Sequence, residues 1–235
     1  MDEFEELRAG GALLKKDARG HNLTTDTLLL ADFARLKRGE CCIDLGCGSG
    51  ALCVLLSQRA KDSRFTAIEI QPEAAEIARE NFAANGLGER SIVITGDFRD
   101  YKKLLPVGGA DAVVSNPPYF SEKSGARAGT ERRELQRRET GCTLNDVIAA
   151  AAWALRNGGA LFLVYRPERL SELLCAMTTA RVEPKRLRLT HRAIDAPPSL
   201  VLVEGRRGGK AGLAIEPPLI LTDGKIGGTK EEEEQ

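Results

Sequence analysis

The sequence predicts an α/β fold in which a mostly parallel sheet carries helices on both faces. From residue 41 onward strand and helix patterns alternate strictly, as in sheets built from strand–helix–strand units. A glycine-rich turn follows the first buried strand, as in Rossmann-like nucleotide-binding folds. The last two strand patterns have no helix between them, which predicts an antiparallel hairpin at one edge of the sheet.

The first forty residues are expected to form a cap ahead of this sheet. Ala12–Lys16 and His21–Leu23 are predicted to pair as a small hairpin around the turn at Ala18–Gly20. A helix is predicted from Asp26, because Thr25 or Asp26 offers a suitable N-cap side chain. Residues 1–40 are therefore interpreted as an N-terminal hairpin and helix cap.

Seven strands and four further helices follow in alternation. The strands are expected at residues 41–45, 65–70, 91–95, 111–115, 160–165, 185–190 and 200–204. The helices are expected at residues 51–59, 72–85, 143–156 and 167–179. Pro72 suits the first turn of a helix, and Asn157-Gly158-Gly159 suits the end of one. Residues 41–212 are then the main domain, and residues 213–235 are a C-terminal extension with a disordered acidic tail.

Composition indicates a globular protein outside the membrane. The 235 residues are 42% hydrophobic and 29% charged, which is ordinary for such proteins. No apolar run approaches the roughly 20 residues that cross a bilayer. The acidic start, Met1–Glu6, lacks the cationic head of a signal peptide. We therefore expect a cytoplasmic protein with no membrane contact, and nothing in the sequence indicates an obligate protein partner.

The six cysteines are expected to be free thiols that pack as small apolar side chains. Cys41 and Cys42 are adjacent in a buried strand pattern, which is poor geometry for disulfide bridges. No Cys-x-x-Cys pair or histidine cluster completes a zinc site, so no metal is expected. A redox or metal role remains the alternative.

Charge is unevenly distributed although the formal net charge is zero. Residues 119–212 contain 17 Lys and Arg against 10 Asp and Glu, whereas residues 1–118 contain 15 against 18. A basic region beside a reaction centre would suit a polyanionic substrate. Arginines scattered over a solvated surface are the alternative explanation.

The turn Asp44-Leu45-Gly46-Cys47-Gly48-Ser49-Gly50 predicts a site for a nucleotide-like cofactor. Glycine allows a tight turn and close approach of a ligand to the backbone. Glu69 ends the next strand, about twenty residues on, where a carboxylate can accept hydrogen bonds from both ribose hydroxyls. Asp97 follows the third strand, where an acid can accept from an adenine amino group. Three successive strand ends thus supply groups at the ligand-binding edge of the sheet.

The spacing of the glycines distinguishes between cofactors. Dinucleotide-binding proteins carry G-x-G-x-x-G, but this chain has G-x-G-x-G followed by Ala51. Asp44 also suits the cationic amino-acid end of S-adenosylmethionine better than it suits a pyrophosphate. A methyltransferase is therefore the favoured interpretation. A nicotinamide-binding protein and a glycine turn without a cofactor are the alternatives.

The turn Asn116-Pro117-Pro118-Tyr119 follows the fourth strand and is the candidate reaction site. Two prolines make it rigid and remove two N–H donors. The Asn116 side chain and the Pro117 carbonyl offer two acceptors for the two N–H groups of a planar amine, and Tyr119 can stack on the ring. Catalysis would then rest on positioning and electrostatics. The alternative is a Pro-Pro turn that only ends a strand.

These motifs resemble the class I S-adenosylmethionine-dependent methyltransferases that methylate amino groups and carry (N/D)PP(Y/F/W). More narrowly, the chain is similar to the bacterial adenine-N6 methyltransferases that modify tRNA(Val) next to the anticodon. The stretches that carry the resemblance are Thr24–Ala31, Asp44–Gly50, Asn116–Tyr119, Leu161–Arg169 and Val203–Gly209. The family implies a strand order of 3-2-1-4-5-7-6 with the seventh strand antiparallel. It also implies that Thr25 and Asp26 lie over the methionine end of the cofactor.

The resemblance implies S-adenosyl-L-methionine as cofactor, S-adenosyl-L-homocysteine as product and tRNA as partner. The candidate cofactor residues are Thr25, Asp26, Asp44, Gly46, Cys47, Gly48, Gly50, Glu69, Ile70, Asp97, Phe98 and Asn116. The candidate catalytic residues are Asn116, Pro117, Pro118 and Tyr119. The candidate RNA contacts are Lys123, Arg127, Arg132, Arg133, Arg137, Arg138, Arg186, Arg188, Arg206 and Arg207. A plain charged helix and a strand edge protected by charge are the alternatives for these basic residues.

Two related activities compete with adenine-N6 methylation of an unpaired tRNA base. Protein methyltransferases that act on a glutamine amide, as in release factors, share Asn-Pro-Pro-Tyr, but they usually carry a larger helical N-terminal domain. DNA adenine-N6 methyltransferases are the next alternative, although no target-recognition domain is apparent. An RNA-binding protein with a relic cofactor fold is disfavoured because every cofactor and reaction position is filled.

Overall fold

The computed structural model describes residues 4–7, 11–15, 23–117, 141–222 and 225–226. Its main feature is a ten-stranded sheet in the order β12-β11-β8-β9-β7-β6-β3-β4-β5, with β10 also paired to β8. The seven predicted strands are β3 (Cys41–Leu45), β4 (Arg64–Glu69), β5 (Ser91–Thr95), β6 (Ala110–Ser115), β7 (Leu155–Tyr165), β8 (Val182–His191) and β9 (Pro198–Arg207). Only β9 among these seven runs antiparallel to its neighbours. The strand order implied by the resemblance is therefore confirmed.

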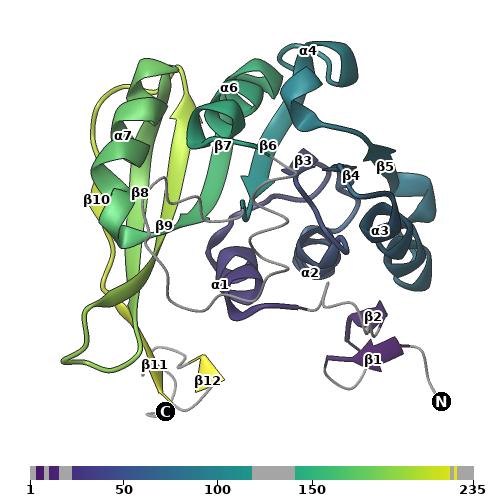
Figure 1. Ribbon diagram of the computed structural model, residues 1–235, viewed down its shortest axis with the longest axis horizontal. Helices are drawn as coiled ribbons and strands as arrows, with labels where there is room; N and C mark the ends of the chain where they lie inside the picture. The colour runs from purple at the N-terminus through teal and green to yellow at the C-terminus, as the bar shows by residue number, and fades with distance from the viewer. Residues whose placement is uncertain (1–3, 8–10, 16–22, 118–140, 223–224, 227–235) are drawn as a thin grey trace.

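Helices cover both faces of this sheet (Figure 1). Helices α1 (Thr25–Phe33), α2 (Ala51–Arg59) and α3 (Pro72–Ala84) lie on one face. Helices α6 (Leu144–Ala154) and α7 (Leu170–Thr179) lie on the other, with the short α4 (Tyr101–Leu104) beside α6. Three 3-10 turns, η1 (Gly88–Arg90), η2 (Phe98–Asp100) and η3 (Pro167–Arg169), precede β5, α4 and α7. None of the described helices combines the length and the apolar character that a membrane span requires.

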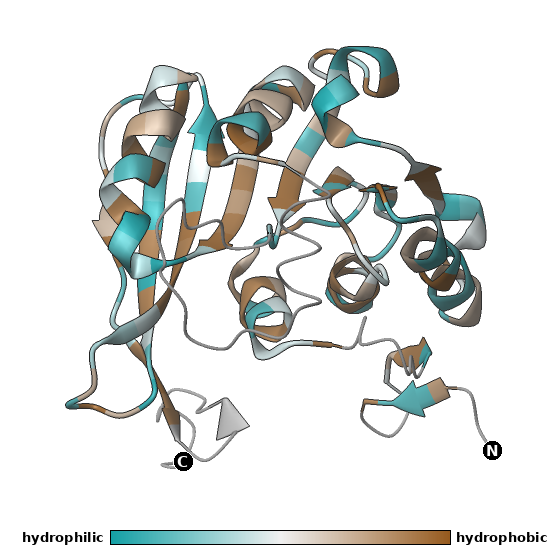
Figure 2. Cartoon of the chain, viewed as in Figure 1, coloured by the Kyte–Doolittle hydropathy of each residue, from teal (hydrophilic) through white to brown (hydrophobic). Residues whose placement is uncertain are grey.

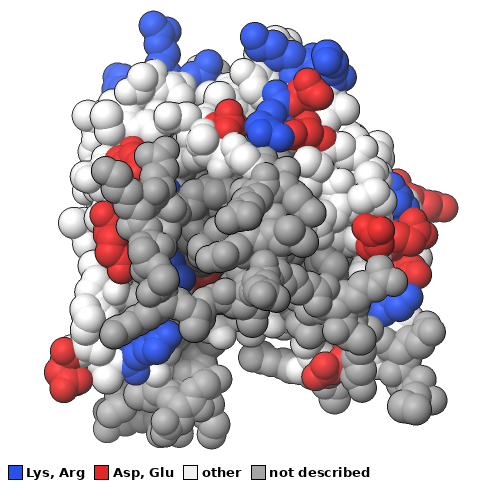
Figure 3. Space-filling model, in the orientation of Figure 1, with Lys and Arg blue, Asp and Glu red and all other residues white. Residues whose placement is uncertain are grey.

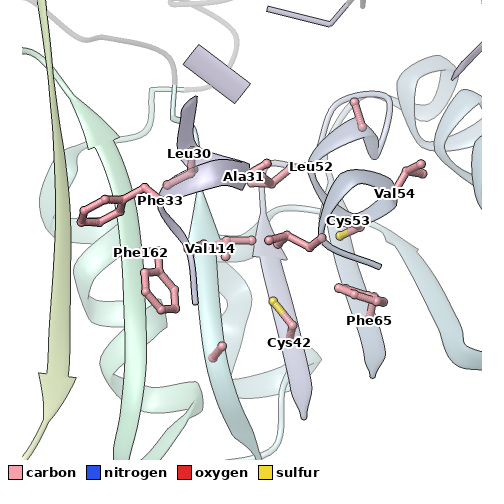
Figure 4. Packing of buried hydrophobic residues seen from close by; sticks show 14 of the residues in the cluster. Leu30, Ala31, Phe33, Cys42, Leu52, Cys53, Val54, Phe65, Val114 and Phe162 are labelled. Atoms are coloured by element: carbon pink, nitrogen blue, oxygen red, sulfur yellow. The ribbon is translucent and has the colours of Figure 1, made fainter. Parts of the chain in front are cut away.

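The sheet separates two hydrophobic cores because side chains alternate along each strand. In β7, Phe162 and Val164 join the core under α1 and α2, whereas Leu161 and Leu163 join the core under α6 and α7. Figure 4 shows the first core, where Phe33 meets the Phe162 ring edge-on at a centroid distance of 6.5 Å. Brown, hydrophobic residues run along much of β6 and β7 in Figure 2.

The N-terminal hairpin differs from the prediction. Strand β2 (Leu13–Lys15) pairs with β1 (Phe4–Glu6) and not with residues 21–23. The opposite edge of β2 is occupied by side chains of α3, which hold the backbone of Leu13 and Lys15. Residues 16–22 lie outside the described part of the chain, and Leu23 is not in a strand.

Two helix boundaries also differ from the predictions. Helix α1 is capped by Thr24, whose Oγ1 accepts from the Thr27 amide at 3.3 Å, and not by Thr25 or Asp26. Helix α6 ends at Ala154, two residues before the predicted end at residue 156, and β7 begins at once with Leu155 paired to Ala110. The pairing shifts register before Ala160, so the Asn-Gly-Gly sequence forms an irregularity within the strand.

The antiparallel hairpin of β8 and β9 is confirmed, but it is not the edge of the sheet. Strands β10 (Ala214–Ile215) and β11 (Leu219–Thr222) pair in parallel with β8. Strand β12 (Lys225–Ile226) then pairs with β11. The extension after residue 212 therefore contributes to the sheet, and residues 227–235 lie outside the described part.

Candidate active site

The glycine turn is anchored to the end of β4. Gly46, Gly48 and Gly50 have φ angles of 76°, 54° and 73°, which other residues rarely adopt. The Gly46 amide donates to the Ile68 carbonyl at 2.9 Å, and the Gly48 amide donates to Glu69 Oε2 at 2.8 Å. The backbone of the turn is therefore held at the carboxyl end of the parallel strands.

The glycines of this turn serve two purposes. A Cβ at Gly50 would lie 2.7 Å from a ring carbon of Phe82, so Gly50 permits close packing of the turn on α3. A Cβ at Gly48 would meet no atom of the described residues within 4 Å, so packing among them does not require glycine there. The open space at Gly48 beside a carboxylate and backbone amides fits a bound nucleoside.

Glu69 is a rigid acceptor at the end of β4. It is 8% exposed, and its Oε1 accepts from the Gln71 amide at 2.9 Å while its Oε2 accepts from Gly48. A carboxylate oxygen can accept more than one hydrogen bond. Glu69 is thus oriented by the backbone and retains the capacity to accept from a pair of hydroxyl groups.

Asp44 is a buried acid with a weak partner. It is 1% exposed, and Cys53 Sγ donates to its Oδ2 at 3.5 Å. Burial raises the pKa of Asp44 to about 7; the Cys53 hydrogen bond lowers it and the nearby Glu69 carboxylate raises it. No cation contacts Asp44 among the residues that the structure describes. Such a site is suited to a ligand that carries a positive charge.

Asp97 and Ile70 flank the site at the ends of β5 and β4. The Asp97 side chain accepts from the Arg99 amide at 2.9 Å and pairs with the Arg99 guanidinium through Nε at 2.7 Å. The hydrogen bond from Arg99 holds the pKa of Asp97 below its usual value. Ile70 is 38% exposed. A Cβ added at Gly46 would lie 3.9 Å from Cε1 of Phe98. The apolar pair could contact a flat base.

Asn116 follows β6 and faces the start of α1. Its Nδ2 donates to Thr27 Oγ1 at 3.1 Å, and Thr27 Oγ1 lies 3.0 Å from Thr24 Oγ1. The preceding Ser115 is fully buried and donates to the Leu45 carbonyl at 2.7 Å, which ties the ends of β6 and β3 together. Pro117 is buried. Pro118 and Tyr119 lie outside the described residues.

The first turn of α1 therefore lies against the end of β6. Thr25 is exposed and Asp26 is half-buried, and both are next to the Thr24–Thr27 cap that contacts Asn116. The fold thus brings α1, the glycine turn and Asn116 to one edge of the sheet.

Arg186 does not provide a solvent-facing cation as the sequence predicted. Its guanidinium pairs with Glu204 at 2.5 Å and Glu216 at 2.8 Å, and it lies 4.3 Å from the centroid of the Phe33 ring. Its side chain is 12% exposed. Because its guanidinium is held by these internal partners, we no longer count Arg186 among the candidate RNA contacts.

The other candidate arginines among the described residues also have internal partners, and the side chains of Arg188 and Arg206 are 27% and 39% exposed. Arg188 pairs with Glu216 at 3.1 Å, and Arg206 pairs with Glu204 at 2.7 Å. Arg207 donates to the Ala180 carbonyl at 2.8 Å. Lys123, Arg127, Arg132, Arg133, Arg137 and Arg138 lie outside the described residues. Figure 3 shows basic and acidic side chains interspersed around the margin of this face of the molecule, where the residues are described.

All six cysteines are free thiols as expected, but only Cys42, Cys53 and Cys142 are buried and Cys175 is exposed. No cluster of three or more potential metal ligands occurs in the described ranges. Sequence reasoning missed three polar residues with central contacts: Asn81 on α3, Asn85 at the C-cap of α3, and Glu216 in the C-terminal extension. The only signal for the first two was their spacing of four residues on a helix, which places them on one face.

The strand order, with an antiparallel strand in the penultimate position and a glycine turn after the central strand, is that of a class I methyltransferase fold. A crystal structure described as a predicted O-methyltransferase from Agrobacterium tumefaciens superposes with a TM-score of 0.70 at 25% identity, covering 88% of this chain and 92% of that one. A geranyl diphosphate methyltransferase solved in complex with S-adenosylmethionine shares the fold, with a TM-score of 0.57 and 17% identity over 77% of this chain and 84% of its own.

The chain belongs to the methyltransferase small domain family, whose sequence model matches residues 22–180. A protein of Porphyromonas gingivalis named tRNA1(Val) (adenine(37)-N6)-methyltransferase is 34% identical over 70% of this chain, and the match spans 65% of that protein's length. A protein of the same name from Shigella dysenteriae is 32% identical over 81% of this chain and 82% of its own.

Proposed function

We propose that this protein transfers a methyl group from S-adenosylmethionine to the exocyclic 6-amino group of an unpaired adenine in a tRNA anticodon loop. The observation that carries the proposal is the meeting of three elements at one sheet edge: the glycine turn with Glu69, the buried Asp44, and Asn116 against α1. The names of the relatives from P. gingivalis and S. dysenteriae support the choice of substrate.

The residues of the site fit S-adenosylmethionine, which supplies an electrophilic methyl group on a sulfonium centre when bound. Glu69, held by two backbone amides, would accept hydrogen bonds from the two ribose hydroxyls. Asp44 would compensate the cationic amino-acid end. Ile70 and Phe98 would contact the adenine ring, and Asp97 would accept from its amino group. Thr25 and Asp26, at the start of α1, would lie over the methionine end.

Asn116 and Pro117 would hold the target amine. The hydrogen bond from Asn116 Nδ2 to Thr27 fixes which end of the amide faces α1, and Oδ1 at the other end would be one acceptor for the amine. The Pro117 carbonyl would be the second acceptor. The lone pair of an adenine amine is delocalised into the ring, and two fixed acceptors would favour a pyramidal nitrogen aimed at the donor. A strong general base is then not required, and the proton leaves to solvent after the N–C bond forms.

A tRNA substrate also accords with the basic excess of residues 119–212. Arg188, Arg206 and Arg207, together with Lys123, Arg127, Arg132, Arg133, Arg137 and Arg138, are the proposed phosphate contacts. An unpaired loop base requires little energy to extrude, and single-stranded bases are read by stacking. Work on tRNA would place the protein in the cytoplasm.

The substrate assignment is tested by offering labelled S-adenosylmethionine with tRNA, DNA and release factor in parallel. The tRNA should come from a strain that lacks the modification, and digestion to nucleosides with mass spectrometry should find N6-methyladenosine. Label in release factor alone would replace the proposed substrate with a glutamine amide. Label in DNA alone would indicate a DNA adenine methyltransferase.

The role of Asn116 is tested by Asn116→Ala. We expect turnover to be abolished while the affinity for the cofactor, measured by calorimetry, stays within a few-fold, because the side chain would act on the amine. Asn145→Ala, at an exposed position of α6, is the matched control and should leave turnover unchanged. Loss of cofactor binding in Asn116→Ala would contradict the proposed role.

A further inference from the structure

Asn81 on α3 connects two distant segments through one buried side chain. It is 0% exposed. Its Oδ1 accepts from the Lys15 amide of β2 at 2.7 Å, and its Nδ2 donates to the Ser49 carbonyl of the glycine turn at 2.8 Å. Both ends of the amide are thus used, one by the N-terminal hairpin and one by the candidate cofactor site.

Asn85, one helical turn later, contacts the same hairpin. Its Oδ1 accepts from the Leu13 amide at 2.9 Å, and its Nδ2 donates to the Leu13 carbonyl at 2.7 Å. The two asparagines together pair with the edge of β2 much as a neighbouring strand would. An ion pair between Lys15 and Glu80 adds to this contact. The hairpin beside α3 (Figure 1) is therefore held by polar contacts to one helix, in addition to the buried side chains of Ala12 and Leu14 in the core.

Ser49 is the residue of the glycine turn that helix α3 contacts through Asn81. It is flanked by Gly48 and Gly50, both with positive φ, and glycine permits rotation of the adjoining peptide planes. Helix α3 restrains this segment at two points: the Asn81 amide binds the Ser49 carbonyl, and Phe82 packs against Gly50. Without the donor from Asn81, the largely buried Ser49 residue, which is 9% exposed, would have a carbonyl that must find another partner.

We infer that Asn81 is a positioning residue that couples docking of the N-terminal hairpin to the shape of the glycine turn, and thereby to affinity for the cofactor. The inference rests on the proposed function, because it assigns the glycine turn to S-adenosylmethionine. Coupling between two sites is reciprocal. Cofactor binding therefore also strengthens docking of the hairpin.

Asn85 provides a matched control for this inference. It has the same amide group, caps the C-terminal end of the same helix and holds the same strand, but its side chain bonds to Leu13 and to the Asn81 carbonyl rather than to the glycine turn. A purely structural role predicts the same consequences for loss of either side chain. A positioning role predicts that cofactor affinity changes only when Asn81 is replaced.

The test compares Asn81→Leu with Asn85→Leu, since leucine is similar in size to asparagine. We expect both variants to lower Tm. Asn81→Leu should weaken binding of S-adenosylhomocysteine, measured by calorimetry, by at least about fivefold, the lower range of typical coupling, whereas Asn85→Leu should stay within about twofold. The KM for tRNA should not change in either variant. Equal losses of cofactor affinity in the two variants, or none in Asn81→Leu, would overturn the inference.

Hydrogen exchange on the unaltered protein provides a test that needs no variant. Adding S-adenosylhomocysteine should slow exchange of the Lys15 amide, which donates to Asn81. The reference is the Glu216 amide, which donates to the Leu187 carbonyl in the C-terminal part of the sheet at 2.8 Å and should change less. Equal slowing at both amides would contradict the coupling. Failure of the wild-type protein to bind cofactor would overturn the proposed function together with this inference, whereas the outcomes above affect the inference alone.

Discussion

Two buried carboxylates in the same sheet have opposite surroundings. Asp44 in β3 is 1% exposed, and Glu204 in β9 is 3% exposed. Glu204 accepts from the guanidinium groups of Arg186 and Arg206. Asp44 accepts from the Cys53 thiol at 3.5 Å, and no guanidinium or ammonium group reaches it within the described ranges.

This difference separates a charge that the protein itself compensates from one that it does not. The negative charge of Glu204 is compensated by the protein itself, so its position contributes to the fold. The negative charge of Asp44 is not, and burial raises its pKa to about 7. Perturbed acids of this kind concentrate where ligands bind. Asp44 lies beside the glycine turn, whereas Glu204 lies on the far side of β7 from it.

The largest effect on stability is expected from Glu204→Gln. Removing one partner of a buried ion pair costs about 3–5 kcal/mol, and we expect the lower end because Glu216 still pairs with Arg186. Urea denaturation measures the change. Cofactor affinity should be unaffected. Glu172→Gln, which breaks the exposed pair with Arg169, is the control and should have a much smaller effect. Unchanged stability in Glu204→Gln would show that the charge of Glu204 does not contribute to the fold.

Asp44→Asn should have the opposite profile. A hydrogen bond to a charged group contributes about 1.5–3 kcal/mol, so affinity for the cofactor should fall by roughly 10- to 150-fold. Stability at neutral pH should not fall, because the variant no longer buries an uncompensated acid. Calorimetry and urea denaturation measure the two quantities. A stable Asp44→Asn protein with undiminished affinity would show that Asp44 does not contact the cofactor.

The pH dependence of stability and of cofactor affinity provides a second test with the Asp44→Asn variant. The folded pKa of Asp44 is about 7, above its ordinary value of 3.8, so the folded state holds the proton more tightly than the unfolded state. The resulting stabilisation is complete below about pH 3.8 and is lost as the pH rises to about 7. Wild-type protein should lose stability relative to Asp44→Asn across this range, while its cofactor affinity rises. A stability difference between wild type and Asp44→Asn that does not vary with pH would contradict the raised pKa of Asp44.

The smallest effect is expected from Cys53→Ser. A hydroxyl is a better donor than a thiol, so it should stabilise the ionised form of Asp44 and lower its pKa. The midpoint of the loss of stability with rising pH should move to lower pH by about one unit or less. Cofactor affinity at high pH should be nearly unchanged. Cys42→Ser is the control, because the Cys42 thiol is directed toward the Ile43 carbonyl at 4.0 Å. A shift of equal size in both variants would exclude a specific role for Cys53.

The sequence predicted the elements around the glycine turn almost to the residue. The bounds of β3, α2 and β5 agree with the expectations, because a buried apolar run followed by glycine, or an alternating run between turn residues, leaves few alternative structures. The N-cap of α1 was wrong because Thr24, Thr25 and Asp26 are three consecutive suitable residues. Only their tertiary surroundings select Thr24, which also contacts the Thr27 hydroxyl beside Asn116.

Contacts between segments distant in the sequence could not be predicted in this way. Lys15 and Asn81 are 66 residues apart, and Arg186 and Glu216 are 30 apart. Periodicity says which face of a helix is buried, but not which polar group on another element will meet it. The expectation of a solvent-facing Arg186 was wrong for this reason, since its acidic partners come from a neighbouring strand and from the C-terminal extension.

The position of β8 in the sheet has a consequence for how the chain folds. On one side β8 pairs with β9, and on the other with β10 and β11. All three follow it in the sequence, so a growing polypeptide exposes both hydrogen-bonding edges of β8 until β9 has been synthesised, and one of them until β10 and β11 have followed. Unpaired strand edges are templates for aggregation. Translation that stops between residues 192 and 198 would therefore release a product that adheres to its own copies.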